Sequence, residues 1–79
     1  MEIKFSRHAG RRIKLYGIKR NDITRIIKEG SKTKEGNKIN YQLKISSIKY
    51  PIKIVAELKK DCIFIITAYP LKRGVKNEN

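Results

Sequence analysis

The spacing of apolar residues changes once along the chain, and this change limits the possible folds. Between residues 7 and 30 the apolar residues recur at intervals of three and four, which is the period of an amphipathic helix. Between residues 39 and 59 they alternate with polar residues, which is the period of a half-buried strand. The run 62–69 is apolar at nearly every position. The sequence therefore predicts helices followed by strands, an arrangement of the α+β class.

Two short helices are predicted in the first half of the chain. The first spans 7–16, because Ser6 is a good N-cap and Gly17 is a typical C-terminal stop. The second begins near residues 19–21 and ends at Gly30. Helices of this length are marginal by themselves, so both need a sheet to pack against.

The remaining segments predict a small sheet. Strands are expected at 3–5, 39–45, 52–59 and 62–69, the last of them central. The polar segment 31–38 is expected to be a loop that turns at Gly36-Asn37. The predicted order is β-α-α-β-β-β, with hairpin-joined strands in an antiparallel sheet and the two helices on one face. We expect a single domain over 1–70 and a basic flexible tail over 71–79.

The charge of the chain predicts a polyanionic partner. Twenty Lys and Arg residues against 7 Asp and Glu give a formal net charge of +13 on 79 residues. A compositional bias towards Lys should raise Glu as well, yet Glu is scarce. RNA, DNA, an anionic membrane surface or an acidic protein would match this charge. A membrane surface is the weakest of these, because neither predicted helix has the Trp or Phe face of an interfacial helix.

Several classes of chemistry are disfavoured by what the chain contains. The longest apolar run is far shorter than the ~20 residues that span a membrane, and the N-terminus lacks the apolar core of a signal peptide. One cysteine, Cys62, allows no internal disulfide and suits a reducing cytoplasm. A lone His and a lone Cys do not make a zinc site, and no carboxylate cluster or Gly-rich phosphate loop is present. We expect no metal and no cofactor.

The first predicted helix gathers cations in a way that opposes its own dipole. It contains no carboxylate, and its basic residues are Arg7, Arg11, Arg12 and Lys14. Cations near a helix N-terminus are mildly destabilising, and a bound phosphate would relieve that conflict. His8 and Arg12 are four residues apart and share a face. Two interpretations stay open: this face binds phosphate with His8 as a proton-transfer group, or the arginines extend into water and His8 is structural.

Further candidate residues lie on the predicted strands and in the tail. Glu57 is a second candidate base, and alternation along its strand places it on the helix-free side, away from His8. Tyr69 ends the last strand, where it could stack against a base, donate a proton or close the edge of the core. Three more basic residues are candidates for nucleic-acid binding: Lys53, Lys72 and Arg73.

One string of residues carries a resemblance. Residues 5–18 read FSRHAGRRIKLYGI, which resembles the opening of a family of small bacterial and archaeal domains that typically read HAxxRMxxRGI. Members continue with a short helix ending in Gly and with three strands that finish in a TxY segment, here 67–69. The resemblance covers 5–70. Two positions depart from the pattern: Tyr16 replaces the second arginine, and Lys19 replaces the usual small cap residue.

That family has no firmly assigned function, but its fold is similar to the RelE/BrnT-like toxins of toxin–antitoxin pairs, many of which cleave RNA without a metal. The resemblance implies a cytoplasmic RNA endonuclease that uses the ribose 2′-OH as nucleophile, with His8 as base or acid and with Arg12 and Arg11 on the phosphate. Free or ribosome-bound RNA would be the substrate, and an acidic antitoxin would be the protein partner. A basic surface would equally suit a non-catalytic module that binds RNA, DNA or a ribosome.

Overall fold

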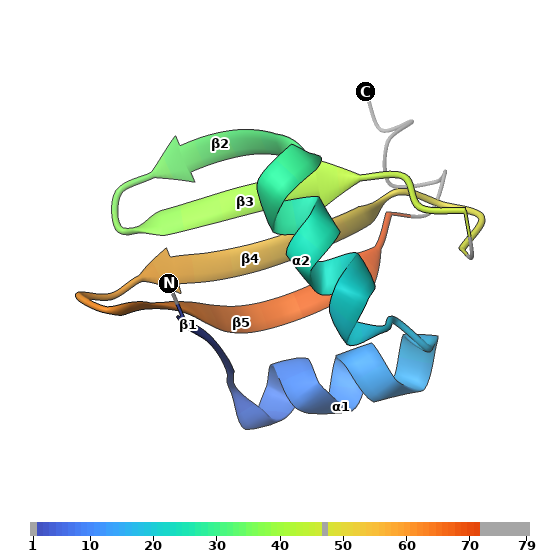
Figure 1. The fold of residues 1–79 in the computed structure, drawn as a ribbon, viewed down its shortest axis with the longest axis horizontal. Coiled ribbons are helices and arrows are strands. Elements are labelled where there is room, and N and C mark those ends of the chain that lie inside the picture. The colour runs from blue at the N-terminus through green and yellow to red at the C-terminus, as the bar shows by residue number, and fades with distance from the viewer. Residues whose placement is uncertain (1, 47, 72–79) are drawn as a thin grey trace.

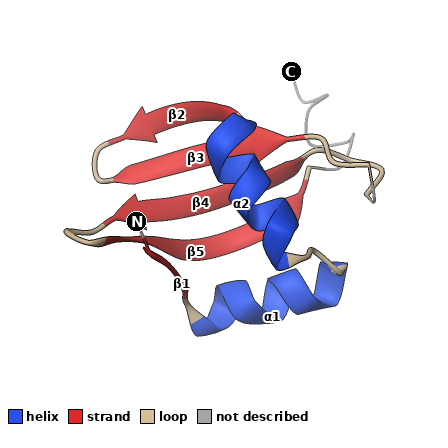
Figure 2. Cartoon of the chain, viewed as in Figure 1, coloured by secondary structure: helices blue, strands red, loops and turns tan. Residues whose placement is uncertain are grey.

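The structure of the protein, a computed structural model, describes residues 2–46 and 48–71. The elements in chain order are β1 (Glu2–Phe5), α1 (Arg7–Tyr16), α2 (Arg20–Glu29), β2 (Ser31–Glu35), β3 (Lys38–Leu43), β4 (Ile52–Leu58) and β5 (Cys62–Pro70) (Figure 1). The class is α+β, as predicted, with both helices packed against the same face of the sheet (Figure 2). Among the described residues, neither helix has the length and apolar character needed to cross a membrane.

The sheet differs from the predicted one in its order and its directions. Its five strands lie in the order β1-β5-β4-β3-β2. β1 pairs with β5 in parallel, while the other three pairings are antiparallel, so the sheet is mixed. The run that was expected to be central, β5, lies between β1 and β4, and the middle strand is β4.

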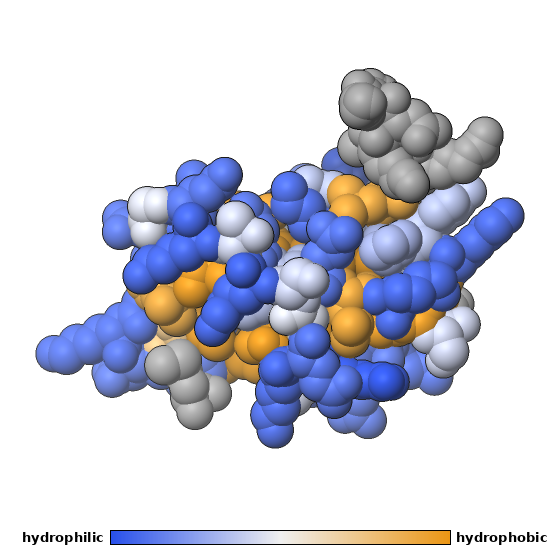
Figure 3. Space-filling view, turned by 90° about the horizontal axis from the view of Figure 1, so that it is seen from above, coloured by the Kyte–Doolittle hydropathy of each residue, from blue (hydrophilic) through white to orange (hydrophobic). Residues whose placement is uncertain are grey.

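The prediction of a loop over 31–38 is wrong, because residues Ser31–Glu35 form the strand β2. All five residues of β2 are exposed, so this strand buries no side chain and gives no alternating apolar signal. It exists because it pairs with β3 through a tight turn in which Gly36 adopts a positive φ of 62°. Seen from the β2 side of the molecule, the surface is mostly hydrophilic, with apolar residues visible between the long polar side chains (Figure 3). The predicted turn at Gly36-Asn37 is confirmed.

The predicted limits of α1 are confirmed by its caps. The Ser6 hydroxyl accepts a hydrogen bond from the Ala9 N–H at 2.9 Å, as an N-cap does. The same hydroxyl donates to the carbonyl of Ile66 at 2.8 Å, which ties the start of α1 to β5. At the other end Gly17 has a φ of 69°, a left-handed conformation that favours glycine.

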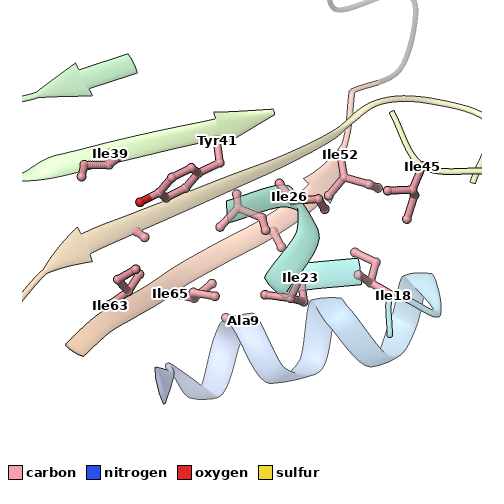
Figure 4. Packing of buried hydrophobic residues seen from close by; sticks show 13 residues of the cluster. Ala9, Ile18, Ile23, Ile26, Ile39, Tyr41, Ile45, Ile52, Ile63 and Ile65 are labelled. Atoms are coloured by element: carbon pink, nitrogen blue, oxygen red, sulfur yellow. The ribbon is translucent and has the colours of Figure 1, made fainter. Parts of the chain in front are cut away.

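The core lies between the helices and one face of the sheet, and isoleucine dominates it (Figure 4). The largest fully buried side chains are Ile23, Ile26, Ile52, Ile54 and Ile65. Full burial of one such side chain contributes about 1.5–3 kcal/mol. This explains how two ten-residue helices become stable: their apolar stripes are covered by the sheet.

One irregularity interrupts the pairing of β4 with β5. Val55 is paired with Thr67, while the next residue of β4, Ala56, is paired with Ile65. Ile66 is therefore an extra residue in β5, which makes this a β-bulge. Its carbonyl is the one that accepts the Ser6 hydroxyl.

Candidate nucleic-acid interface on α1 and the helix-free sheet face

Helix α1 turns its apolar side to the core and its cations to solvent. Ala9 is fully buried, and Ile13 and Tyr16 pack against the core cluster. Among its other residues, Arg7, His8, Arg11 and Lys14 are exposed and Arg12 is half-buried, and Leu15 is an exposed apolar residue between them. The predicted phosphate-binding residues of α1 are therefore all accessible to a ligand, and His8 is not part of the core.

The two flanks of α1 face different parts of the molecule. Gly10 and Ile13 line a cavity of about 230 Å³ together with Phe5, Arg20 and Ile23, so this flank faces α2. His8 and Arg12 lie on the opposite flank, because residues four apart stack on one side of a helix. They therefore point away from α2.

The positive charge of α1 is not neutralised within the described part of the protein. The ion pairs among residues 2–46 and 48–71 join Arg25 to Glu29 and Lys59 to Glu57, and neither involves α1. The first turn of α1 contains no acidic residue. A phosphate at this helix would meet cations that have no competing carboxylate partner.

Tyr69 and Lys53 lie side by side on the helix-free face, which is the far side of the sheet in Figure 1. They are paired across β4 and β5, and both are half-buried. α1 runs beside β5 in the same direction, from its attachment at Ile65 and Ile66 (Figure 1). His8, in the first turn of α1, lies near the attachment at Ile65 and Ile66, and Tyr69 lies three residues beyond Ile66 on β5, which corresponds to about 10 Å along the strand.

Glu57 faces the helix-free side, as predicted, but at the opposite end from Tyr69. Its cross-strand partners are Phe64 and Lys38, and its carboxylate lies 3.8 Å from the Lys59 ammonium. It is four residues from Lys53 along β4, which corresponds to about 13 Å. The structure therefore separates the two predicted proton-transfer residues of the sheet, Glu57 and Tyr69.

Two further residues predicted to bind nucleic acid belong to the C-terminal tail. Lys72 and Arg73 lie outside the described residues. The described chain ends at Leu71, whose N–H donates to the carbonyl of Pro51 at 2.8 Å. Within the described ranges, no three His, Cys, Asp or Glu side chains are grouped so that they could hold a metal ion.

Sequence reasoning missed several residues of the helix-free face. Phe64 is half-buried there, with the Lys59 ammonium 5.4 Å from its ring centroid. Asn40 and Gln42 lie on the same face of β3, because their neighbour Tyr41 points into the core. Burial raises the pKa of the Tyr41 phenol above its ordinary value, and this group takes no part in the interface. The alternation of Asn40 and Gln42 with apolar residues was visible in the sequence, but only the strand register shows which side chains lie beside them.

A larger cavity of about 490 Å³ lies between β1 and α2, where Arg20 sits 5.9 Å from the ring centroid of Phe5. It is lined by Glu2, Ile3, Phe5, Arg20, Ile23 and Thr24. None of the predicted site residues lines it. This cavity is therefore separate from the cationic flank of α1.

Comparison with known proteins identifies a family for this chain. No curated protein matches the sequence at a significant level. A family described as "Domain of unknown function (DUF4258)" matches residues 5–70, from the last residue of β1 to the end of β5. Because the match covers most of the 79 residues, the chain belongs to the family of domains described as DUF4258.

Proposed function

We propose that this domain is a metal-independent RNA endonuclease similar to the RelE/BrnT-like toxins, and that its reactive site lies on the flank of α1 that carries His8 and Arg12. One observation carries the proposal: His8 is exposed and Arg12 follows one turn later, on a helix that has no carboxylate. Imidazole and guanidinium groups at this spacing can act on one phosphodiester. The fold-level resemblance supports the reaction class.

The proposed reaction is an internal transfer that needs no outside nucleophile. The ribose 2′-oxygen attacks the adjacent phosphorus while His8 accepts the proton of that hydroxyl. Arg12 and Arg11 stabilise the negative charge that develops on the phosphoryl oxygens. The bond to the 5′-oxygen breaks, and the leaving oxygen takes a proton from the Tyr69 hydroxyl. The products are a 2′,3′-cyclic phosphate and a free 5′-hydroxyl.

The test is cleavage of RNA by the purified protein in EDTA, with mapping of the new ends. Wild-type protein is expected to produce cyclic phosphate ends, and His8→Ala is expected to abolish them. Arg25→Ala is the matched control, because Arg25 is an exposed cation on α2. Full activity of His8→Ala would remove this site assignment.

A second candidate function is a non-catalytic module that binds RNA, DNA or a ribosome. It is favoured by the position of Glu57, which lies at the far end of the sheet and supplies no second base near α1. Such a module would bind RNA with steep salt dependence and without new ends. His8→Ala would then leave RNA affinity nearly unchanged, whereas the endonuclease would lose its product.

The charge of α1 also supports a proposal about a protein partner, an acidic antitoxin that covers this helix. Opposite charge promotes association and suppresses other partners. Expression of the chain alone is expected to arrest growth, and co-expression of a small acidic protein encoded beside it is expected to restore growth. An equal effect of the neighbouring protein on a chain with Arg7, Arg11 and Lys14 changed to Ser would contradict this placement.

A further inference from the structure

We infer that one end of the helix-free sheet face reads the bases of a single RNA strand whose phosphates are held by α1. This inference rests on the proposed function only in taking RNA as the ligand, and it does not require cleavage. It adds residues of β2 and β3 that neither the motif nor the reaction includes, and it gives the Tyr69 ring a stacking role besides that of its hydroxyl.

The strand register divides the helix-free face into rows of side chains. Residues paired across neighbouring strands face the same side. One row consists of Thr67, Val55, Asn40 and Thr33, and the next consists of Tyr69, Lys53, Gln42 and Ser31. Neither row contains a carboxylate, and Lys53 is the only charged residue in the two rows. We call these two rows the acid-free end.

The carboxylates of the helix-free face are gathered at its other end. The row there consists of Lys4, Phe64, Glu57, Lys38 and Glu35, and Glu2 lies beyond it, opposite Cys62. Negative side chains repel the phosphates of a nucleic acid, and Lys38 is paired across the strands with both Glu57 and Glu35. The acid-free end is therefore the part of the face that an RNA strand can occupy.

The side chains of the acid-free end have the chemistry of base recognition. The amides of Asn40 and Gln42 each offer a donor and an acceptor, which together can pair with the edge of one base. Hydroxyl groups lie at both ends of each row, on Thr67 and Thr33 in the row of Asn40 and on Tyr69 and Ser31 in the row of Gln42. Tyr69 presents a half-buried ring on which a base can stack. An extended strand can offer these base edges, whereas the edges of a duplex are paired.

The position of α1 supplies the matching phosphate contacts. The Ser6 N–H donates to Ile65 and the Ser6 hydroxyl to Ile66, so the start of α1 is fixed beside the row that contains Thr67. From there the helix runs along β5 towards the end of that strand (Figure 1), where Tyr69 lies. A strand that starts at α1 and crosses the sheet would thus have its first phosphates at α1 and its following bases over β5, β4 and β3. An acidic protein would match Lys53 but would leave the two amides without a role, so RNA is the occupant that the surface favours.

The experiment uses RNA that the protein cannot cleave. The probes are four fluorescein-labelled 12-mers with 2′-O-methyl riboses: oligo-U, oligo-A, oligo-C and a mixed sequence that contains G. Each is titrated with the protein, and binding is followed by fluorescence anisotropy. Tyr69→Ala is expected to weaken binding to all of them about 10-fold, and Tyr69→Phe is expected to keep it, because stacking needs the ring and not the hydroxyl. Asn40→Ala and Gln42→Ala are expected to change the ratio of Kd values among the sequences by about 5-fold.

The matched control is Asn21→Ala, which removes an exposed amide from α2 and is expected to leave every Kd ratio unchanged. Thermal unfolding checks that each variant is folded. The inference is overturned if folded Asn40→Ala, Gln42→Ala and Tyr69→Ala bind all four sequences as wild type does. It is also overturned if polyglutamate displaces every RNA equally and the variants do not change this competition.

The two proposals fail in different ways. If His8→Ala removes cleavage of ordinary RNA while the sheet variants keep wild-type binding, the endonuclease stands and the base-reading surface does not. If no RNA is cleaved but Tyr69→Ala and Gln42→Ala alter binding as described, the surface stands and the endonuclease does not.

Discussion

Helices α1 and α2 have the same length and the same task in the core, yet their charges are arranged differently. α2 carries Asp22 in its first turn, where the carboxylate accepts a hydrogen bond from the Lys19 N–H, and an Arg25–Glu29 pair along its surface. α1 has neither an acid in its first turn nor an ion pair among the described residues. α2 follows the rules that stabilise a helix, whereas α1 lacks these features and carries cations without an ion-pair partner among the described residues.

Glycine distinguishes the two helices as well. Gly30 ends α2 where the chain passes very close to β3, and a Cβ there would lie 2.6 Å from the carbonyl oxygens of Gln42 and Ile26. Gly10 lies inside α1, and a Cβ there would meet nothing within 4 Å. Packing therefore requires the glycine of α2 and does not require the one of α1. Four changes test this comparison, in order of decreasing effect on stability.

Gly30→Ala is expected to have the largest effect, a loss of about 3 kcal/mol in the free energy of unfolding. The new methyl group would collide with two backbone oxygens that cannot move independently of α2 and β3. Urea unfolding measures the change. A loss of less than about 0.5 kcal/mol would mean that α2 and β3 separate easily, and the contrast with Gly10 would disappear.

Ser6→Ala is expected to cost about 1–2 kcal/mol, because the hydroxyl both caps α1 and donates to Ile66. The N-cap of α2 provides the matched control, since the Lys19 side chain makes no cap hydrogen bond. Lys19→Ala is expected to be nearly neutral in the same urea experiment. Equal losses for the two variants would show that the caps do not differ as described.

Gly10→Ala is expected to stabilise the protein by about 1 kcal/mol, since alanine is the better helix former and the methyl group has free space. Thermal unfolding should show a higher Tm. Gly17→Ala serves as the opposite control, because its φ of 69° disfavours a side chain and should lower Tm. A lower Tm for Gly10→Ala would mean that this position is constrained in the folded protein.

Arg7→Glu is expected to have the smallest effect on stability, a gain of a few tenths of a kcal/mol from a carboxylate in the first turn of α1. Its effect on RNA should be larger: weaker binding to every sequence and a salt slope that is smaller by about 1. Arg25→Glu on α2 breaks the pair with Glu29 and should cost about 0.5 kcal/mol, with little change in RNA affinity. Equal losses of affinity would place the RNA on both helices.

The helices were predictable from sequence because their signals are local. Ser6, Gly17 and Gly30 mark helix ends through the chemistry of a single residue, and the isoleucine spacing marks the buried side. β2 was missed because it has no local signal. Its residues are all exposed, and it is a strand only because the Gly36 turn brings it beside β3. An edge strand that buries nothing leaves no pattern in its own residues.

The candidate site was predictable in part. The shared face of His8 and Arg12 follows from a spacing of four, and the helix-free position of Glu57 follows from alternation. The neighbours of Tyr69 did not follow from any local pattern, because they depend on the pairing of β5 with β4 and of β4 with β3. The separation of Glu57 from Tyr69 is a property of the register alone.

The extra residue at Ile66 sets a limit on how this chain can change in length. In a regular strand, residues 65, 67 and 69 would all point to the same side, but Ile65 is in the core while Thr67 and Tyr69 are on the other face. Removal of Ile66 would make Ile65 and Thr67 neighbours in a regularly alternating strand, so Ala68 would stay in the core and Tyr69 on the helix-free face. The loss would instead fall on α1, whose Ser6 hydroxyl donates to the Ile66 carbonyl. In the regular parts of β4 and β5 a one-residue deletion would exchange inner and outer side chains, so the bulge is the place where this pairing can lose a residue.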